Sequence, residues 1–278
     1  MKRFSGFLLE LCLLFAGLGT VTAQQMSDGV TPPPKVLQVI VEYLKPGKSG
    51  SLHQASEAGF VQAFQAANWP THYLAVDSMT GAPRSLFFVA YDSFAAWEKD
   101  AMATQKNAAL SAALDRAGIA DGELLESSQS NVLVYREDYS LRAPVNIPLM
   151  RYFEIQRFKI RPGHEKEWDT LVKMYVDGYQ KTVPNAHWAT YESVYGMNNG
   201  GVYIVITPMK SAGEIDQNFA DSKKFMTAMG DDWMKKAGDL AASCLEESQN
   251  NLFMFNPKMS YVQDQWIKAD PAFWKPAQ

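Results

Sequence analysis

The chain has 278 residues, with 26 Lys and Arg against 30 Asp and Glu, which gives a net charge of −4. This acidic balance disfavours nucleic acid as a partner, because phosphate binding needs a basic face. The sequence holds two cysteines, and Cys12 falls in a segment that we expect to be removed, so Cys244 would be left without an internal disulfide partner.

Residues 1–23 have the pattern of a secretory signal peptide. Lys2 and Arg3 form a basic start, residues 7–21 are mostly apolar, and Val21-Thr22-Ala23 fits the small-residue cleavage rule. We therefore expect an exported protein, periplasmic or extracellular, whose mature chain begins at Gln24. Amino-terminal sequencing of the exported form checks this, and a chain that keeps residues 1–23 would contradict it. No later stretch is apolar over the ~20 residues that a membrane span needs.

The remaining sequence predicts strands and helices in an order that occurs twice. Residues 24–35 form a proline-rich linker. In the first module, 36–141, we expect a strand at 36–44, a helix at 51–67, a hairpin of strands at 71–78 and 85–91, a helical region at 93–117 and a strand at 124–135. In the second module, 149–258, we expect a strand at 150–160, a helix at 164–181, strands at 188–195 and 202–207, a helical region at 211–240 and a final strand around 251–255. Residues 259–278 form an aromatic tail, which we expect to pack on a domain surface.

Three matched phrases show that the two modules are copies. Pro46-Gly47 and Pro162-Gly163 follow the first strands, and Trp69 and Trp188 follow the first helices. The closing strands open with the related phrases Leu-Glu-Ser-Ser-Gln-Ser-Asn (125–131) and Leu-Glu-Glu-Ser-Gln-Asn-Asn (245–251). Each copy has the order β-α-β-β-α-β, which is the ferredoxin-like order of an α+β fold.

A strand, a Lys/Arg-Pro-Gly turn and a helix with an early aromatic residue resemble the dimeric α/β-barrel superfamily. The best match is Arg161-Pro162-Gly163-His164-Glu165-Lys166-Glu167-Trp168, which looks most like the NIPSNAP-type and antibiotic-biosynthesis-monooxygenase-type branches. In that superfamily two ferredoxin-like modules pair their sheets into a barrel. The resemblance implies that this chain forms such a barrel from its two modules, with a barrel between two chains of a homodimer as the alternative.

Alternation in the two first strands separates an apolar face from a polar one. We expect the apolar face to meet the helices and the polar residues Gln38, Glu42, Glu154 and Gln156 to line the barrel interior. Such an interior is either a ligand cavity or a hydrogen-bonded structural network. Paired carboxylates in a half-dry cavity could also supply a general base. The two copies diverge on this face, with Glu42 against Phe158, so one asymmetric site is expected rather than two.

The four histidines show no spacing typical of a zinc site, because neither His-x-His nor His-x-x-x-His occurs. We therefore predict no metal site and no cofactor. Some members of the superfamily that this chain resembles bind haem through a histidine. His72 is the candidate for that role because it falls in an expected strand. Otherwise it is a hydrogen-bonded strand residue.

These patterns leave three functions open. The first is a small-molecule-binding protein whose ligand lies in a polar-aromatic cavity, with Glu42, His72, Glu154, Gln156 and Trp188 as the candidate residues. The second, implied by the resemblance, is a cofactor-independent monooxygenase-like or haem-handling enzyme. The third is a structural or interaction protein. Trp188 has a structural alternative of its own, as a core residue that closes the barrel end.

Overall fold

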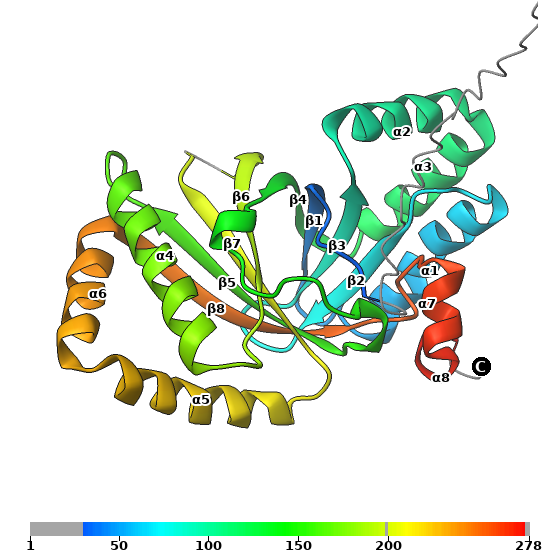
Figure 1. Ribbon diagram of the computed structural model, residues 1–278. Helices are drawn as coiled ribbons and strands as arrows, with labels where there is room; N and C mark the ends of the chain where they lie inside the picture. The colour runs from blue at the N-terminus through cyan, green and yellow to red at the C-terminus, as the bar shows by residue number, and fades with distance from the viewer. Residues whose placement is uncertain (1–29, 198–199, 276–278) are drawn as a thin grey trace, which may run out of the picture.

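The computed structural model describes residues 30–197 and 200–275. Figure 1 shows the strands in the centre, with one group of helices on each side of them. The first half contains β1 (Val36–Leu44), α1 (Ser51–Ala66), β2 (Tyr73–Ser78), β3 (Arg84–Tyr91), α2 (Phe94–Lys106), α3 (Ala108–Gly122) and β4 (Leu125–Tyr135). The second half contains β5 (Tyr152–Ile160), α4 (Glu165–Thr182), β6 (Ala189–Tyr195), β7 (Val202–Met209), α5 (Gly213–Met229), α6 (Asp231–Cys244) and β8 (Leu245–Phe255). Short 3-10 turns at Glu137–Tyr139 and Ile147–Leu149 join the halves, and α7 (Asp264–Ala269) and α8 (Pro271–Trp274) follow β8. The proposed signal peptide lies outside the described residues.

The eight strands form one closed barrel in the order β1-β3-β2-β8-β5-β7-β6-β4. All neighbouring strands are antiparallel, and each half contributes four adjacent strands. The halves meet at two seams, β2 with β8 and β4 with β6. This confirms the expected α+β fold of two ferredoxin-like modules and shows that the barrel closes within one chain.

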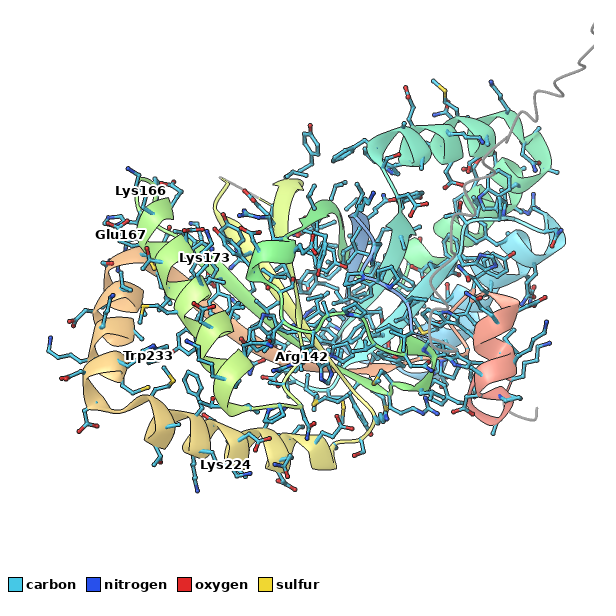
Figure 2. The ribbon with its side chains drawn as sticks, in the orientation of Figure 1. Arg142, Lys166, Glu167, Lys173, Lys224 and Trp233 are labelled. Atoms are coloured by element: carbon cyan, nitrogen blue, oxygen red, sulfur yellow. The ribbon has the colours of Figure 1, made fainter. Side chains whose placement is uncertain are left out.

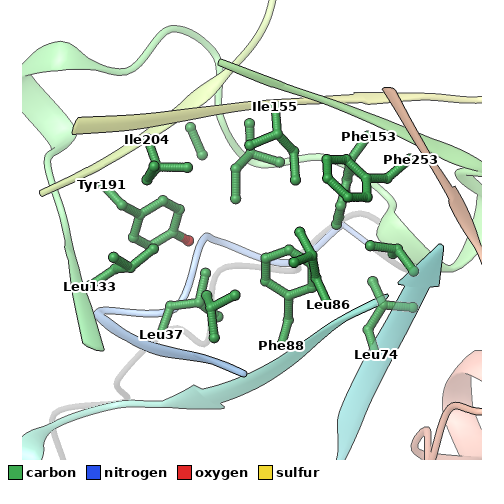
Figure 3. Close-up of a cluster of buried hydrophobic side chains, with 14 of the residues drawn as sticks. Leu37, Leu74, Leu86, Phe88, Leu133, Phe153, Ile155, Tyr191, Ile204 and Phe253 are labelled. Carbon is green, nitrogen blue, oxygen red and sulfur yellow. The ribbon is translucent and has the colours of Figure 1, made fainter. Parts of the chain in front are cut away.

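The barrel interior is a packed apolar core, so the predicted polar interior is wrong. Side chains from all eight strands form one buried cluster that includes Leu37, Phe88, Phe153, Tyr191 and Phe253 (Figure 3). An eight-stranded barrel is just wide enough for side chains to fill it, so the larger apolar residues take the inside. Alternation alone could not choose the face, because helices cover one side of each strand and the barrel core covers the other.

The polar face of each first strand therefore points outward, towards the helices. In the first half this outer face packs Ile40, Ala75 and Phe87 against residues of α1 and α3, such as Ala63 and Leu110. The second half places α4 and α6 over the equivalent strands. Gln38, Glu42, Glu154 and Gln156 accordingly lie outside the barrel.

Each long helical region is broken into two helices at one residue. Asn107 ends α2 and caps α3, where its side chain accepts a hydrogen bond from the backbone N–H of Leu110 at 3.1 Å. Gly230 separates α5 from α6 with φ of +76°, a conformation that favours glycine. The sequence predicted helix in both regions, but not these interruptions.

The aromatic tail packs as expected. Trp274 is buried, and its indole Nε1 donates to the carbonyl of Pro148 at 2.9 Å. Trp266 and Phe273 pack against the same core cluster, beside Trp274. The tail thus covers part of the barrel core at the link between the two halves. Among the described residues, no helix combines the length and the apolarity needed to cross a bilayer.

Candidate functional site

Four ionisable side chains meet in the helical layer of the first half. Glu42 lies near the end of β1, His53 and Glu57 lie one turn apart at the start of α1, and Asp121 lies at the end of α3. We call these four residues the acid–histidine cluster. The outer face of β1 and the packing of α1 on α3 bring them together, since each faces the same gap between sheet and helices.

The imidazole of His53 is the centre of the acid–histidine cluster. Its Nε2 atom lies 3.2 Å from Oε2 of Glu42, 3.5 Å from Oδ1 of Asp121 and 3.8 Å from Oε1 of Glu57. One donor atom from each of the four residues falls within 4.8 Å of every other. The side chains of His53, Glu57 and Asp121 are at most 4 % exposed, and that of Glu42 is 12 % exposed.

The carboxylates of the acid–histidine cluster are poorly compensated. Within the part of the chain that the structure describes, their only ion-pair partner is His53. Oε1 of Glu57 and Oδ1 of Asp121 are buried and accept no hydrogen bond from another side chain or from the backbone of the described residues. The two carboxyl groups contact one another, and this contact becomes a hydrogen bond only when one of them carries a proton. Burial, followed by the charges of Glu42 and Asp121, raises the pKa of Glu57 to about 10. Burial also raises the pKa of Glu42. Buried carboxylates without partners are costly, so the cluster requires added positive charge, from protons or from a cation.

The second half provides an internal control for this arrangement. At the offset that relates Pro46 to Pro162, Glu42 corresponds to Phe158, and Phe158 packs on Trp168 in an aromatic core with Tyr203. The same fold is therefore built with apolar residues at this place. The architecture does not require the polar cluster of the first half, which costs free energy to bury. Costly exceptions to apolar packing concentrate at functional sites.

The two cluster members on α1 also lack counterparts in the second half. At the same offset His53 corresponds to Asp169, and Glu57 corresponds to Lys173, which lies on α4 (Figure 2). Nζ of Lys173 and Oδ1 of Asp169 form an exposed ion pair at 2.6 Å. The expected asymmetry between the halves thus holds for Glu42, His53 and Glu57.

A hydrogen-bond chain fixes the tautomer of His53. The hydroxyl of Ser85 donates to Oδ1 of Asp77 at 2.5 Å, so its oxygen is left to accept from Nδ1 of His53, at 3.3 Å. Nδ1 therefore carries a proton, and in the neutral imidazole the lone pair of Nε2 points at the carboxylates. Metal-bound histidines are held in the same way, with the second ring nitrogen donating to an oriented oxygen.

The donor set fits a metal ion. Ligands that lie about 2.0–2.2 Å from a common ion are separated by roughly 3.0–4.4 Å from one another, as bond geometry requires. The Nε2 separations of 3.2–3.8 Å fall in that range. Three carboxylates and one imidazole match the preferences of divalent manganese, iron and zinc. Our sequence-based prediction of no metal site therefore missed a donor set that the fold assembles.

Of the predicted site residues, only Glu42 belongs to the acid–histidine cluster. Glu154 accepts from Nδ2 of Asn250 at 2.6 Å and from Nε2 of Gln156 at 3.3 Å, in the outer face of the second half. Trp188 is half-buried and donates to the carbonyl of Tyr139 at 2.9 Å. These residues do not line a common cavity as expected, because apolar side chains fill the barrel interior between the two halves.

His72 also lies apart from the other candidates. It precedes β2 instead of lying within a strand, and its ring stacks on Tyr261 at 4.6 Å between centroids. Burial lowers the pKa of His72. Haem binding through His72 stays a prediction.

One sequence signal could have identified two members of the cluster. His53 and Glu57 form a His-x-x-x-Glu pair, which places both side chains on one face of a helix. The absence of paired histidines argued against a zinc site, but that criterion does not include a mixed His–Glu pair. Asp121 and Ser85 carry no local signal, because only tertiary packing brings them to His53.

The raised pKa of Glu57 predicts how stability depends on pH in the absence of metal. The folded chain keeps a proton on Glu57 at pH values where the unfolded chain, with a pKa near 4.5, has lost it. Glu57 thus contributes stability that is fully present below about pH 4.5 and is lost as pH rises towards about 10. Urea unfolding in chelator should show stability falling over this interval. Glu57→Gln should flatten the decline, and an equally steep decline in that variant would contradict the assignment.

Comparisons with known proteins identify the fold. No family model matches the sequence, and no curated protein matches it either. The solved structures that it resembles include an anthrone oxidase-like protein, with 14% identity, a TM-score of 0.52, and coverage of 80% of this chain and 92% of that chain. A protein provisionally described as a monooxygenase, from Lactobacillus acidophilus, has 6% identity, a TM-score of 0.50, and coverage of 82% and 97%. Another of the same description, from Fusobacterium nucleatum, has 13% identity, a TM-score of 0.50, and coverage of 81% and 94%. At these identities the likeness shows a dimeric α/β-barrel fold, as the sequence resemblance implied, and does not assign an activity.

Proposed function

We propose that this dimeric α/β-barrel protein binds one divalent metal ion at the acid–histidine cluster. The observation that supports this most directly is the set of buried carboxylate oxygens, on Glu57 and Asp121, that face His53 and accept no hydrogen bond from another side chain or from the backbone of the described residues. A divalent cation would offset the buried negative charge, which a neutral imidazole cannot do. The aromatic packing at the same place in the second half supports a single ion per chain.

Manganese(II) and iron(II) fit this donor set best. Three carboxylates are hard oxygen ligands, and one imidazole adds the nitrogen that transition metals accept more readily than magnesium or calcium does. Cys244, the cysteine within residues 30–197 and 200–275, is buried in the core of the second half and takes no part in the cluster. Four protein ligands leave two positions of a six-coordinate ion for water or for a small ligand.

Titration of chelator-treated protein with Mn²⁺ tests the proposal. Isothermal calorimetry should show one ion per chain, with release of protons because Glu57 must lose its proton to coordinate. The thermal midpoint should rise with Mn²⁺ concentration, since an ion that binds only the folded state stabilises it. Absence of both effects for Mn²⁺, Fe²⁺ and Zn²⁺ would overturn the proposal and leave protons as the charge that balances the cluster.

Oxidation chemistry is a second candidate function. It is favoured by the fold that this chain shares with proteins described as anthrone oxidase-like and as monooxygenases, although the likeness extends to the fold alone. A manganese or iron ion would supply redox chemistry at such a site. Oxygen consumption by the Mn²⁺- or Fe²⁺-loaded protein with phenolic substrates tests this candidate. Equal rates in the loaded and the chelated protein would argue against it.

We also propose that the protein binds its ion after export. This rests on the sequence of residues 1–23 alone, which has the basic start, apolar stretch and small-residue cleavage site of a signal peptide.

A further inference from the structure

The acid–histidine cluster is connected to the end of the second half by hydrogen bonds. Asp77, which accepts from Ser85 through Oδ1, accepts through its other oxygen from Nδ2 of Asn256 at 2.6 Å. The orientation of the Asn256 amide is fixed, because its Oδ1 accepts from the backbone N–H of Lys258 at 3.1 Å. A continuous chain thus runs from Asn256 through Asp77 and Ser85 to Nδ1 of His53.

Asn256 lies in a segment that is held across the first half. It directly follows β8, is 5% exposed, and its backbone N–H donates to the carbonyl of Ala75 at 2.9 Å. Further along, the hydroxyl of Ser260 accepts from the N–H of Ala75, and Tyr261 pairs with Tyr73 at the start of β2. The segment therefore extends the seam between β2 and β8, one of the two places where the halves meet.

We propose that Asn256 is a positioning residue for metal binding. Through Asn256, closure of the β2–β8 seam sets the affinity of the acid–histidine cluster for its metal ion. Asn256 orients Asp77, and Asp77 accepts the hydrogen bond of the Ser85 hydroxyl. The oxygen of Ser85 can then only accept from His53, which requires the proton of the imidazole to be on Nδ1. The lone pair of Nε2 is then directed at the ion. This inference rests on the proposed metal function. By linkage, an ion bound at the cluster must stabilise the seam to the same extent as the seam strengthens binding.

An exchange of donor and acceptor across the 77–256 contact tests the proposal. Asn256→Asp places two carboxylates against one another. Asp77→Asn can accept from Asn256 only if its N–H group turns towards Ser85, which reverses the hydrogen bond from the Ser85 hydroxyl. Each change should weaken Mn²⁺ binding by about 10–100-fold, the usual loss for groups that orient a metal ligand. The double variant Asp77→Asn/Asn256→Asp restores one donor and one acceptor, so its affinity should return to within a few-fold of the wild type. The free energy of unfolding of the chelated variants is measured beside the affinity, because residues in contact are coupled in stability as well. A contact that served structure alone would be rescued in unfolding free energy, with no matching change in Mn²⁺ affinity.

Ser140→Ala is the matched control. It removes a comparable hydrogen bond, which the hydroxyl accepts from the backbone N–H of Thr190 at 2.9 Å, away from the β2–β8 seam and from the chain to His53, so Mn²⁺ affinity should be unchanged. Single variants that bind Mn²⁺ as tightly as the wild type, or a double variant no better than the two losses combined, would overturn the proposal. If the wild type binds no metal, the proposed function itself fails.

Hydrogen exchange of the wild-type protein provides a test that does not depend on variants folding. Mn²⁺ should slow exchange of the amides of residues 256 and 261, whose N–H groups donate to Ala75 and Tyr73 across the seam. The backbone N–H groups of residues 132–135, at the β4–β6 seam, should change much less. Equal protection at both seams, or none at either, would count against coupling through Asn256.

Discussion

Glu57→Gln should abolish tight Mn²⁺ binding while leaving the fold intact. The change keeps the size of the side chain but removes one of the three charges, and the amide is a poor ligand compared with a carboxylate. We expect a loss of affinity beyond the roughly 10–100-fold typical of groups that only orient a ligand. Calorimetry and the Mn²⁺ dependence of the thermal midpoint measure it.

The same substitution should make the chelated protein more stable at pH 8. Glu57 is 3% exposed, and at pH 8 the folded chain must keep a proton on it that the unfolded chain has lost. A neutral amide does not require this proton, so the free-energy cost of holding it disappears. Loss of metal binding together with a gain in metal-free stability is the signature of a residue retained for function. A purely structural glutamate would lose stability instead.

Asp169→Asn is the matched control in the second half. Asp169 occupies the position that corresponds to His53, but it pairs with Lys173 and accepts from the hydroxyl of Tyr139 at 3.0 Å. Its replacement should leave Mn²⁺ affinity unchanged. Binding that survives Glu57→Gln, or that falls equally in Asp169→Asn, would contradict a single site in the first half.

The architecture was predictable because it depends on patterns that recur along the chain. The Pro-Gly turns, the tryptophans after the first helices and the matching final strands all mark equivalent points in two modules. Their order is sufficient for the ferredoxin-like arrangement, and the fold followed from it. The helix breaks at Asn107 and Gly230 were not predicted, because each is a single capping or turn residue within a long helical pattern.

The site was less predictable because its members are joined only by tertiary packing. Glu42 was a candidate because it is a carboxylate on the polar face of a strand. The alternation of polar and apolar residues could not decide whether that face points into or out of the barrel. Asp121 and Ser85 come from α3 and β3, and nothing near them in the sequence indicates a shared partner. His53 and Glu57 had a visible spacing, yet a lone His–Glu pair is common on helices and gains meaning only from the carboxylates that the fold adds.

Phe153→Ala should strongly destabilise the barrel. Phe153 is 5% exposed and contacts Phe88 and Phe255 edge-on, with centroids 5.6 and 4.6 Å apart. Loss of a buried phenyl ring costs about 3–5 kcal/mol when neighbours cannot close the cavity. The closed strands of both halves hold those neighbours in place, so we expect the upper part of this range. Urea unfolding should show a lower midpoint with an unchanged slope.

Phe219→Ala is the control for the same chemical change at the surface. Phe219 lies on α5 and is 68% exposed, so its loss should alter stability by less than about 0.5 kcal/mol.

The comparison between Phe153→Ala and Phe219→Ala also separates a packed barrel interior from a ligand-binding cavity. A cavity that bound a ligand would tolerate Phe153→Ala with little cost and would change in ligand affinity instead. Because side chains from all eight strands share this core, its loss should weaken both halves together, and unfolding should remain a single transition. Separate transitions for the two halves would show that each module has a core of its own.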